Sequence, residues 1–454
     1  MSELSFLHTD SYNETDLQSA IQRHFELLNI QIAPDARVVI KPNLIMRCGP
    51  ERAATTHPAI VEAVVRQLQA MGVRDITIAD SPGGLYTPQL LAAAYAATGM
   101  ETVAKQYGVK LNTAVGSREL RGADAALCRT FDIIDPVADA DCVINLCKLK
   151  THCMTMLSCG VKNLFGCIPG LLKPQLHYRF PDTDAFARML IDLSLLVRPA
   201  LTIVDAVMAM EGNGPTGGRA RPLGFTAAAR FDGLYALDLV MAHLIGLTPR
   251  YVPTVADAIG RGLCPCDWSQ AVVLGDTLPP PFDDFLPPDS KRLDFTNNIP
   301  APLAVLVRRI QPKLAPRPHV RPRDCVGCGR CAESCPAKTI QIKNKKAKIN
   351  LSNCIHCFCC QEMCPVRAID VHTVKLFHLF SKSRQVFPIG PACGTICTGQ
   401  TVLPLAAETG FAGLAAALRQ ASAKGFAAVV HWTYSHRKWG LADEIDCGRC
   451  TCKN

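Results

Sequence analysis

Two cysteine runs of identical spacing constrain the fold of this chain more than any other feature. Together with one extra cysteine, they hold nine of the chain's 23 cysteines between residues 325 and 365. Each run reads Cys-x2-Cys-x2-Cys-x3-Cys-Pro; the first contains Cys325, Cys328, Cys331 and Cys335, and the second contains Cys354, Cys357, Cys360 and Cys364. Bacterial-type ferredoxins bind two 4Fe–4S clusters with this spacing. The runs therefore predict two 4Fe–4S clusters as the cofactors.

The fourth cysteine of such a run leaves its own loop and binds the other cluster. We therefore assign cluster 1 to Cys325, Cys328, Cys331 and Cys364, and cluster 2 to Cys354, Cys357, Cys360 and Cys335. Cys359 is supernumerary, because the spacing favours Cys360 as the ligand. A zinc site is the alternative, but zinc sites usually show paired Cys-x2-Cys arms separated by a longer gap. A disulfide framework would suit a secreted protein.

Composition favours a cytoplasmic protein with a sizeable core. The 454 residues are 48% hydrophobic and 19% charged. The 23 cysteines indicate metal binding in a reducing compartment and not the disulfides of a secreted protein. The first residues show no secretory signal, and no stretch reaches the roughly 18 apolar residues of a membrane span. The formal charge of +9 is offset by about −2 for each bound cluster, so charge alone does not indicate a nucleic-acid partner.

The first 277 residues alternate between strand and helix patterns. Strands are expected near 36–44, 73–80, 109–114, 131–134, 140–149, 200–207 and 271–275, and helices near 16–28, 58–71, 88–107, 183–197, 234–246 and 254–262. Thr56 is the expected cap of the second helix, and Pro58 suits its first turn. This alternation predicts an α/β fold, with a mostly parallel sheet and helices on both faces.

Four regions follow from these patterns. An α/β domain (1–277) is followed by a Pro-rich basic linker (278–322), a small α+β ferredoxin-type domain (323–375) and a C-terminal extension (376–454). The extension holds five cysteines, namely Cys393, Cys397, Cys447, Cys450 and Cys452. These either build a third metal site or are incidental.

Polar residues follow several of the predicted strands, and ligands of open parallel sheets bind at the carboxyl ends of strands. We predict His152 and Lys150 as catalytic residues. The predicted substrate-binding residues are Lys41, Asn43, Asp80, Ser81, Lys148, Lys162, Asn163 and Asn213. The glycine-rich segment 211–218 lacks the Lys-Ser/Thr of a phosphate-binding loop, so it is expected to be a turn.

Several of these segments together resemble a known family. They are KPN (41–43), ATTHP (54–58), ADSPGG (79–84), NLCKLKTH (145–152), GVKNLFGCIPG (160–170) and MEGNGPTGG (210–218). They resemble family 362 of the domains of unknown function, and CIHCFCCQEMCP (354–365) resembles the ferredoxin module often fused to its members. The resemblance covers about residues 35–375. It implies two 4Fe–4S clusters and no particular substrate.

Three functions remain open from the sequence. The first is an oxidoreductase that passes electrons from a soluble carrier, such as a ferredoxin or flavodoxin, to a small anionic substrate held by lysines. No flavin or nicotinamide motif is visible to mediate a two-electron step. The second is a non-catalytic electron-transfer subunit whose α/β domain docks a partner. The third keeps the clusters structural, with redox-neutral chemistry in the α/β domain.

Overall fold

The computed structural model describes residues 2–290 and 316–372, together with three short strands near the C-terminus. The chain forms two units, Met1–Lys375 and Leu376–Asn454. In the second unit, β16 (Thr395–Thr398) pairs antiparallel with β17 (Thr401–Pro404) and with β18 (Val429–Val430). Cys397 lies in β16, but its side chain and the other four cysteines of the extension lie outside the described residues. The hypothesis of a third metal site therefore stays a prediction.

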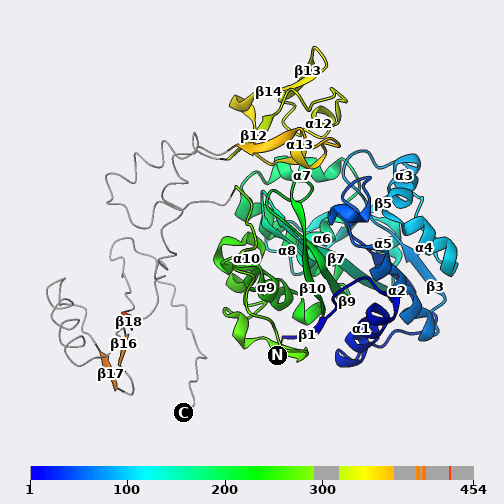
Figure 1. Cartoon of the computed structure of the whole chain (residues 1–454), viewed down its shortest axis with the longest axis vertical. Coiled ribbons are helices and arrows are strands. Elements are labelled where there is room, and N and C mark those ends of the chain that lie inside the picture. The colour runs from blue at the N-terminus through cyan, green and yellow to red at the C-terminus, as the bar shows by residue number, and fades with distance from the viewer. Residues whose placement is uncertain (1, 291–315, 373–394, 399–400, 405–428, 431–454) are drawn as a thin grey trace. The chain divides into compact units, whose positions relative to one another are not determined.

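The first unit is built on a nine-stranded mixed sheet (Figure 1). Its strands are β1 (Glu3–His8), β2 (Arg37–Lys41), β3 (Asp75–Ile78), β4 (Lys110–Leu111), β7 (Cys142–His152), β8 (Met156–Ser158), β9 (Leu201–Glu211), β10 (Arg219–Arg230) and β11 (Val272–Gly275). Their order is β11-β1-β10-β9-β7-β2-β3-β4, and β8 pairs with β7 off this path. Five of the eight pairings are parallel. The predicted α/β fold with a mostly parallel sheet is confirmed.

Helices cover both faces of this sheet, as the buried strands of a parallel sheet require (Figure 1). One face packs on α1 (Glu14–Leu27), α2 (Pro58–Ala70), α3 (Pro88–Thr98) and α4 (Met100–Tyr107). The other packs on α6 (Gly160–Asn163), α8 (Thr183–Val197), α9 (Leu234–Leu244) and α10 (Pro253–Gly260). The remaining elements are α5 (Asp135–Asp139), α7 (Leu172–Arg179) and the hairpin of β5 (Ser117–Arg121) and β6 (Thr130–Ile134). Each face thus has its own apolar core.

Several local features differ from the sequence prediction, among them strand β1, which was not predicted. His57, and not Thr56, is the N-cap of α2, because its Nδ1 accepts the N–H of Ala59 at 3.2 Å. Thr56 instead donates its hydroxyl to the carbonyl oxygen of Leu146 at 2.8 Å, which ties the start of α2 to β7. The long strand β10 was not predicted. Its pairing with β9 shifts register between Pro222 and Phe225, because proline cannot donate to the ladder.

The cysteine-rich module occupies residues 317–372. Its outer strands β12 (Arg317–Val320) and β15 (Ile369–His372) pair antiparallel, and β13 (Ile340–Lys343) forms a hairpin with β14 (Lys346–Ile349). Each cysteine run contains a short helix around its third cysteine, α12 (Arg330–Glu333) or α13 (Cys359–Glu362), and the fourth cysteine follows the helix. The two halves repeat the same arrangement.

The segment predicted to be a linker begins as part of the α/β domain. Phe285 is buried, and the N–H of Phe282 donates to the carbonyl oxygen of Leu244 at 2.8 Å. The N–H of Leu286 donates to Glu211 Oε2 at 3.0 Å. Residues 291–315 of this segment, with the basic pair Arg308 and Arg309, lie outside the described residues.

Candidate functional site

A cavity of about 80 Å³ lies at the carboxyl ends of the parallel strands, and the cysteine-rich module forms one of its walls. From the α/β domain it is lined by residues that include Lys41, Asn43, Asp80, Ser81, Lys150, Lys162, Asn163, Lys173 and His177. From the module it is lined by Ser334, Cys359, Glu362 and Met363. We call this space the inner cavity. Four lysines and two carboxylates face it, so its wall carries an excess of positive charge.

The structure brings together seven of the ten residues predicted for catalysis and substrate binding. Those that line the inner cavity are Lys41, Asn43, Asp80, Ser81, Lys150, Lys162 and Asn163. They come from the ends of β2, β3 and β7 and from α6, which meet at one edge of the sheet. Lys148, His152 and Asn213 do not line it.

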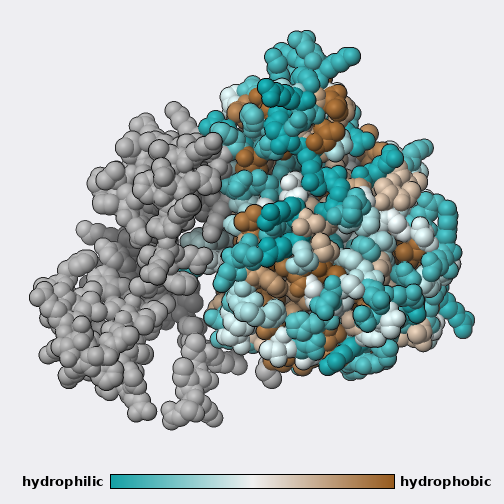
Figure 2. All heavy atoms as spheres, viewed as in Figure 1, coloured by the Kyte–Doolittle hydropathy of each residue, from teal (hydrophilic) through white to brown (hydrophobic). Residues whose placement is uncertain are grey.

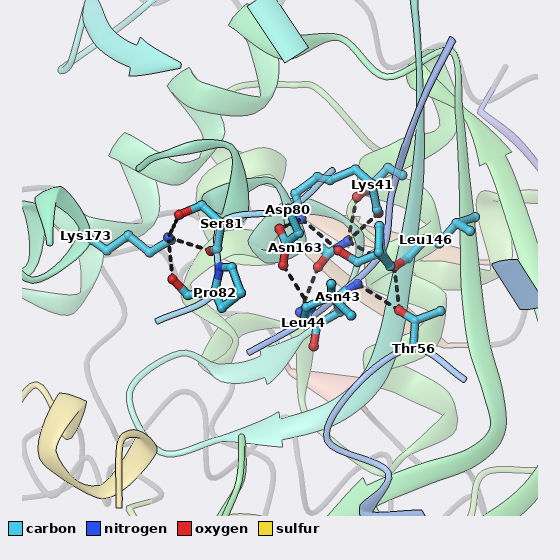
Figure 3. Close-up of polar contacts among 12 residues, drawn as sticks. Lys41, Asn43, Leu44, Thr56, Asp80, Ser81, Pro82, Leu146, Asn163 and Lys173 are labelled. Carbon is cyan, nitrogen blue, oxygen red and sulfur yellow. Dashed lines mark hydrogen bonds and ion pairs between the residues drawn. The ribbon is translucent and has the colours of Figure 1, made fainter. Parts of the chain in front are cut away.

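The first pair of the site is a buried ion pair at the ends of β2 and β3. Lys41 Nζ donates to Asp80 Oδ1 at 2.7 Å, and the two side chains are 0% and 4% exposed (Figure 3). Asp80 Oδ2 accepts the N–H of Leu44 at 2.9 Å. A Cβ on Gly166 would come within 2.1 Å of Asp80 Oδ1 and 2.6 Å of Lys41 Nζ, so only glycine fits there.

Lys150 is held by neutral oxygens only. Its Nζ donates to Asn43 Oδ1 and to the carbonyl oxygen of Ala54, both at 2.6 Å. Asn43 Nδ2 donates to Asn163 Oδ1 at 2.7 Å, and Asn163 Nδ2 donates to Asn145 Oδ1 at 2.8 Å (Figure 3). This chain of amides fixes the ammonium without a counter-charge. Burial, with repulsion from Lys162, lowers the pKa of Lys150 to about 7.

Lys173 lies on α7 across the cavity. Its Nζ donates to the carbonyl oxygen of Ser81 at 2.7 Å, to Ser81 Oγ at 2.9 Å and to the carbonyl oxygen of Pro82 at 3.3 Å (Figure 3). Burial lowers the pKa of Lys173 to about 7, because the attraction of Asp80 is largely offset by repulsion from Lys41. Two of the four lysines therefore exchange protons near neutral pH.

Lys162 is the cation of the site that is left without a protein partner. Its ammonium lies 5.6 Å from the ring centre of Phe165, and it makes no hydrogen bond or ion pair within residues 2–290 and 316–372. Burial lowers the pKa of Lys162, while the charge of Glu362 acts in the opposite direction. An ammonium group directed into a cavity without a partner is suited to bind an anion.

His152 acts on the cavity through Glu362. His152 Nδ1 accepts the N–H groups of Met154 at 3.0 Å and Thr155 at 3.3 Å, so the proton of the neutral ring resides on Nε2. Nε2 lies 3.0 Å from Glu362 Oε1. Burial lowers the pKa of His152 to about 4, so the ring is neutral at pH 7 and its Nε2 lies beside the carboxylate. Burial raises the pKa of Glu362, but His152 and Lys162 outweigh it and lower the value to about 2.

Two predicted substrate-binding residues have structural partners instead. Lys148 forms a buried ion pair with Asp205 at 2.5 Å and also donates to the hydroxyl of Tyr12 at 3.0 Å. Asn213 Nδ2 donates to Asp289 Oδ2 at 2.7 Å, and Asn213 Oδ1 accepts the N–H of Asp289 at 2.9 Å. Neither residue lines the inner cavity: Lys148 is engaged by Asp205 and Tyr12, beyond which the pairing of β7 with β9 shifts register, and Asn213 is engaged by Asp289.

The glycine-rich segment 211–218 is a docking turn for the module. Gln361 Nε2 donates to the carbonyl oxygen of Asn213 at 2.9 Å, and Thr216 Oγ1 donates to the carbonyl oxygen of Glu362 at 3.3 Å. A Cβ on Gly217 would lie 2.8 Å from Gln361 Nε2, so the close approach of α13 needs glycine. The turn holds the module's helix against the strand ends.

The cysteines of the module surround two further cavities. One, of about 20 Å³, is lined by Cys325, Cys328, Cys331 and Cys364; the other, of about 10 Å³, is lined by Cys335, Cys354, Cys357, Cys359 and Cys360. Backbone N–H groups donate to several of these sulfurs, for example Ala368 to Cys364 at 3.1 Å and Ala347 to Cys325 at 3.4 Å. Such bonds stabilise the thiolates that bind iron–sulfur clusters. The donor set and the cavities therefore fit two clusters.

A cage of this kind suits a group of several atoms better than one metal ion. In the part of the chain that the structure describes, no three His, Cys, Asp or Glu side chains converge as the ligands of a single ion. A zinc site would require four ligands within about 2.3 Å of one point.

Cys359 lies between the module's second cavity and the inner cavity, and it lines both. Its side chain is buried, between Phe358 and Cys360 at the start of α13. Phe358 also packs with Cys153 of the α/β domain, which anchors this part of the module. The supernumerary cysteine is thus the closest side-chain link between the two spaces.

Sequence reasoning missed several residues of the inner cavity, among them Lys173, His177, Glu362 and Met363. Lys173 and His177 lie just beyond the segment that ends at Gly170, and their position after a Gly-containing turn was an available signal. Glu362 and Met363 lie inside the second cysteine run. No local pattern shows that this run faces strands more than 200 residues earlier in the chain.

Within the described residues, no helix is long and apolar enough to cross a membrane. The sequence is 33% identical over 270 residues to the thylakoid-associated protein sll1697 of Synechocystis sp., and the match covers 58% of this chain and 80% of that protein. Among solved structures, it is similar to the lactate racemase apoprotein from Thermoanaerobacterium thermosaccharolyticum (13% identity, TM-score 0.33, 53% of this chain) and to a protein from Thermotoga maritima (11%, 0.29 and 50%). Each of these two matches spans 57% of the solved chain.

Two family descriptions match the sequence. A domain of unknown function (DUF362) matches residues 38–243, which run from β2 to α9 and include every lysine of the inner cavity. A 4Fe-4S dicluster domain matches residues 317–365, which include both cysteine runs. The chain belongs to the DUF362 family and carries a 4Fe-4S dicluster domain behind its family domain.

Proposed function

We propose that this protein is an iron–sulfur oxidoreductase that reduces a small anionic substrate in the inner cavity. Cluster 1 is assigned to Cys325, Cys328, Cys331 and Cys364, and cluster 2 to Cys335, Cys354, Cys357 and Cys360. The observation that carries the proposal is the position of Cys359, which lines both the cluster 2 cavity and the inner cavity. An electron therefore has a short path from the module to a bound substrate.

The charge of the inner cavity supports an anionic substrate. Lys162 makes no direct ion pair within the described residues, although the Glu362 carboxylate lies in the same cavity wall, and Lys150 is held by neutral oxygens. A carboxylate or similar anion would satisfy both ammonium groups by charge-assisted hydrogen bonds. The volume of about 80 Å³ suits a small charged group.

A reduction that adds two hydrogen atoms to the substrate needs two electrons and two protons. When bound, the two clusters would supply electrons one at a time, so two such transfers from the external carrier would be required. Two protons must then reach the substrate. Lys150 and Lys173 suit this role, because a pKa of about 7 allows a group to donate and regain a proton near neutral pH. Neutral His152 is placed to orient Glu362.

Electrons would enter at cluster 1, which is the cluster nearer to solvent. Cys328 is exposed, and Val326 and Val366, which line the same cavity, are 60% and 42% exposed. Figure 2 shows hydrophobic surface on the module amid mainly hydrophilic side chains. The neighbouring hairpin exposes basic residues. A soluble acidic carrier, such as a ferredoxin or flavodoxin in a reducing cytoplasm, fits this surface.

The decisive test is the variant Lys162→Met, with Lys110→Met as the matched control on an exposed lysine. Binding of propanoate to the anaerobically purified protein should weaken by roughly 10- to 100-fold in Lys162→Met, the usual effect of a lost charge-assisted hydrogen bond. Reduction of the clusters by dithionite should be unchanged in both variants. Equal propanoate binding in both variants would instead favour the alternative, a non-catalytic electron-transfer subunit whose α/β domain docks a partner.

Propanoate binding is also expected to depend on pH. Lys150 and Lys173 are charged below their pKa of about 7 and neutral above it. Affinity should therefore be nearly constant below about pH 6, begin to fall as the pH approaches 7, and above pH 7 fall by up to about tenfold per pH unit for each lysine involved. Propanoate itself remains ionised throughout this range, so its own titration does not interfere. Calorimetry at fixed ionic strength measures the profile, and a flat profile to pH 9 would contradict the assignment.

Carrier docking should be sensitive to salt. Lys343, Lys345 and Lys348 are exposed on β13, β14 and the turn between them, beside the cavity of cluster 1. Replacing all three with Gln should lower the rate of electron transfer from an acidic carrier about tenfold at low ionic strength and abolish most of its salt dependence. Lys105→Gln on α4 is the control. An unchanged rate would place docking elsewhere.

A further inference from the structure

A second, larger cavity lies directly beside the inner cavity. It has a volume of about 270 Å³, and we call it the outer cavity. Its apolar lining residues are Met46, Leu85, Leu90, Leu91, Ala93, Ala94, Leu171 and Met363. The two cavities share Gly83, Gly84, Ser334 and Met363, so they are neighbours across a common wall.

The wall between them is thin because it is built from glycine. A Cβ on Gly83 would lie 2.6 Å from Met363 Sδ, and a Cβ on Gly84 would lie 3.2 Å from Met363 Cε. Gly84 also has a φ of +94°, which other residues rarely adopt. The unbranched thioether of Met363 is therefore the module side chain that packs against both glycines at this boundary. A flexible methionine can move aside at little cost.

The two cavities differ sharply in chemistry. The inner cavity is faced by four lysines and two carboxylates, whereas the outer cavity is lined mainly by leucines, alanines and methionines. Its charged lining residues are Arg47, Arg330 and Glu333. Leu85 and Leu90 are 49% and 44% exposed, so apolar surface is left uncovered where the outer cavity meets solvent. Because removing apolar surface from water is favourable, an apolar group that binds here and covers this surface would be stabilised.

We propose that the substrate is an amphiphilic acid, with an anionic head in the inner cavity and an apolar chain or ring in the outer cavity. This proposal rests on the anion-binding role of the inner cavity. The combined space falls in the range of about 300–1,000 Å³ typical of small-molecule sites, whereas the inner cavity alone does not. The head would lie beside Cys359 and Lys162, and the apolar part would extend past Met363 along α3.

The test is a series of straight-chain carboxylates from propanoate to decanoate, bound to the anaerobically purified, cluster-loaded protein and measured by calorimetry. Once the chain passes Met363, each added methylene should tighten binding by about fourfold, the ratio that corresponds to about 0.8 kcal/mol. The gain should stop when the outer cavity is full. Affinity that does not change with chain length would overturn the proposal.

Two adjacent alanines on α3 provide a matched pair of variants. Ala93 lines the outer cavity, whereas Ala92 is exposed and does not line it. Ala93→Phe should fill the outer cavity and weaken octanoate binding at least tenfold, while the affinity for propanoate stays the same. Ala92→Phe should leave both affinities unchanged. Leu90→Ser, at an exposed position, offers a second variant that spares the fold and should reduce the gain per methylene.

The outcomes separate this proposal from the one on which it rests. If propanoate binds and Lys162→Met weakens it, but Ala93→Phe and Ala92→Phe bind octanoate equally, the anion site stands and the apolar site falls. If Lys162→Met leaves propanoate and octanoate unaffected, the anion site itself falls. Both sites are supported if Lys162→Met weakens propanoate binding and if Ala93→Phe, but not Ala92→Phe, weakens octanoate binding.

Discussion

Cys360→Ser is expected to lower the iron content from about eight to about four atoms per chain, whereas Cys359→Ser leaves it at about eight. The two cysteines are adjacent, and both line the module's second cavity. Only Cys360 has the spacing of a cluster ligand. Cys359 also lines the inner cavity, which draws it away from the four-cysteine set. The pair therefore tests the ligand assignment with almost identical chemistry.

Iron and acid-labile sulfide should be measured on protein purified without oxygen, together with the paramagnetic resonance spectrum after reduction. Cys360→Ser should retain the signal of cluster 1 and lose transfer of electrons to the inner cavity by at least about 100-fold, because cluster 2 is the nearer one. The opposite pattern, with iron lost in Cys359→Ser and retained in Cys360→Ser, would reverse the assignment and remove the free thiol from the cavity wall.

Asp80→Asn should destabilise the α/β domain by about 3–5 kcal/mol, the usual cost of leaving one member of a buried ion pair without its partner. Lys41 and Asp80 are 0% and 4% exposed, so water does not replace the lost partner. Urea unfolding followed by circular dichroism in the amide region measures the change. The double variant Lys41→Met with Asp80→Leu should recover much of the loss, because it removes the uncompensated charge.

The matched control is Asp141→Asn, which breaks the exposed pair between Arg37 and Asp141 at the other end of β2. Water screens this pair, so breaking it should lower the free energy of unfolding far less than breaking the buried pair does. Equal losses in Asp80→Asn and Asp141→Asn would mean that burial does not govern the contribution of these pairs.

The parallel core of the fold could be predicted because its strands carry their own signal. Continuous apolar runs such as 200–207 lie between helices of clear period, and they became β9 and its neighbours. β10 could not be predicted in the same way. Pro222 and Gly224 interrupt it, and three consecutive alanines have little strand preference, so pairing with β1 and β9 decides its structure.

The α/β half of the candidate site followed from the rule that strand ends face ligands, which placed Lys41 and Lys150 at one edge. The other half could not be predicted, because it depends on how the module docks. Glu362 reads as an ordinary acidic residue between cluster cysteines until α13 rests on the glycine-rich turn. Lys148 and Lys150 are both lysines of β7, so the sequence does not distinguish them. Only the ion pair with Asp205 shows that Lys148 has a structural role.

The module's place in the wall of the inner cavity has a consequence for biogenesis. A cysteine-rich segment of this size buries too little surface to fold without its metal centres, so cluster insertion and folding occur together. The α/β domain is synthesised first, with its lysines in place but without Cys359, Glu362 and Met363 to close the cavity. Under iron starvation, newly made chains would thus retain a folded α/β domain whose inner cavity stays open on the side of the module.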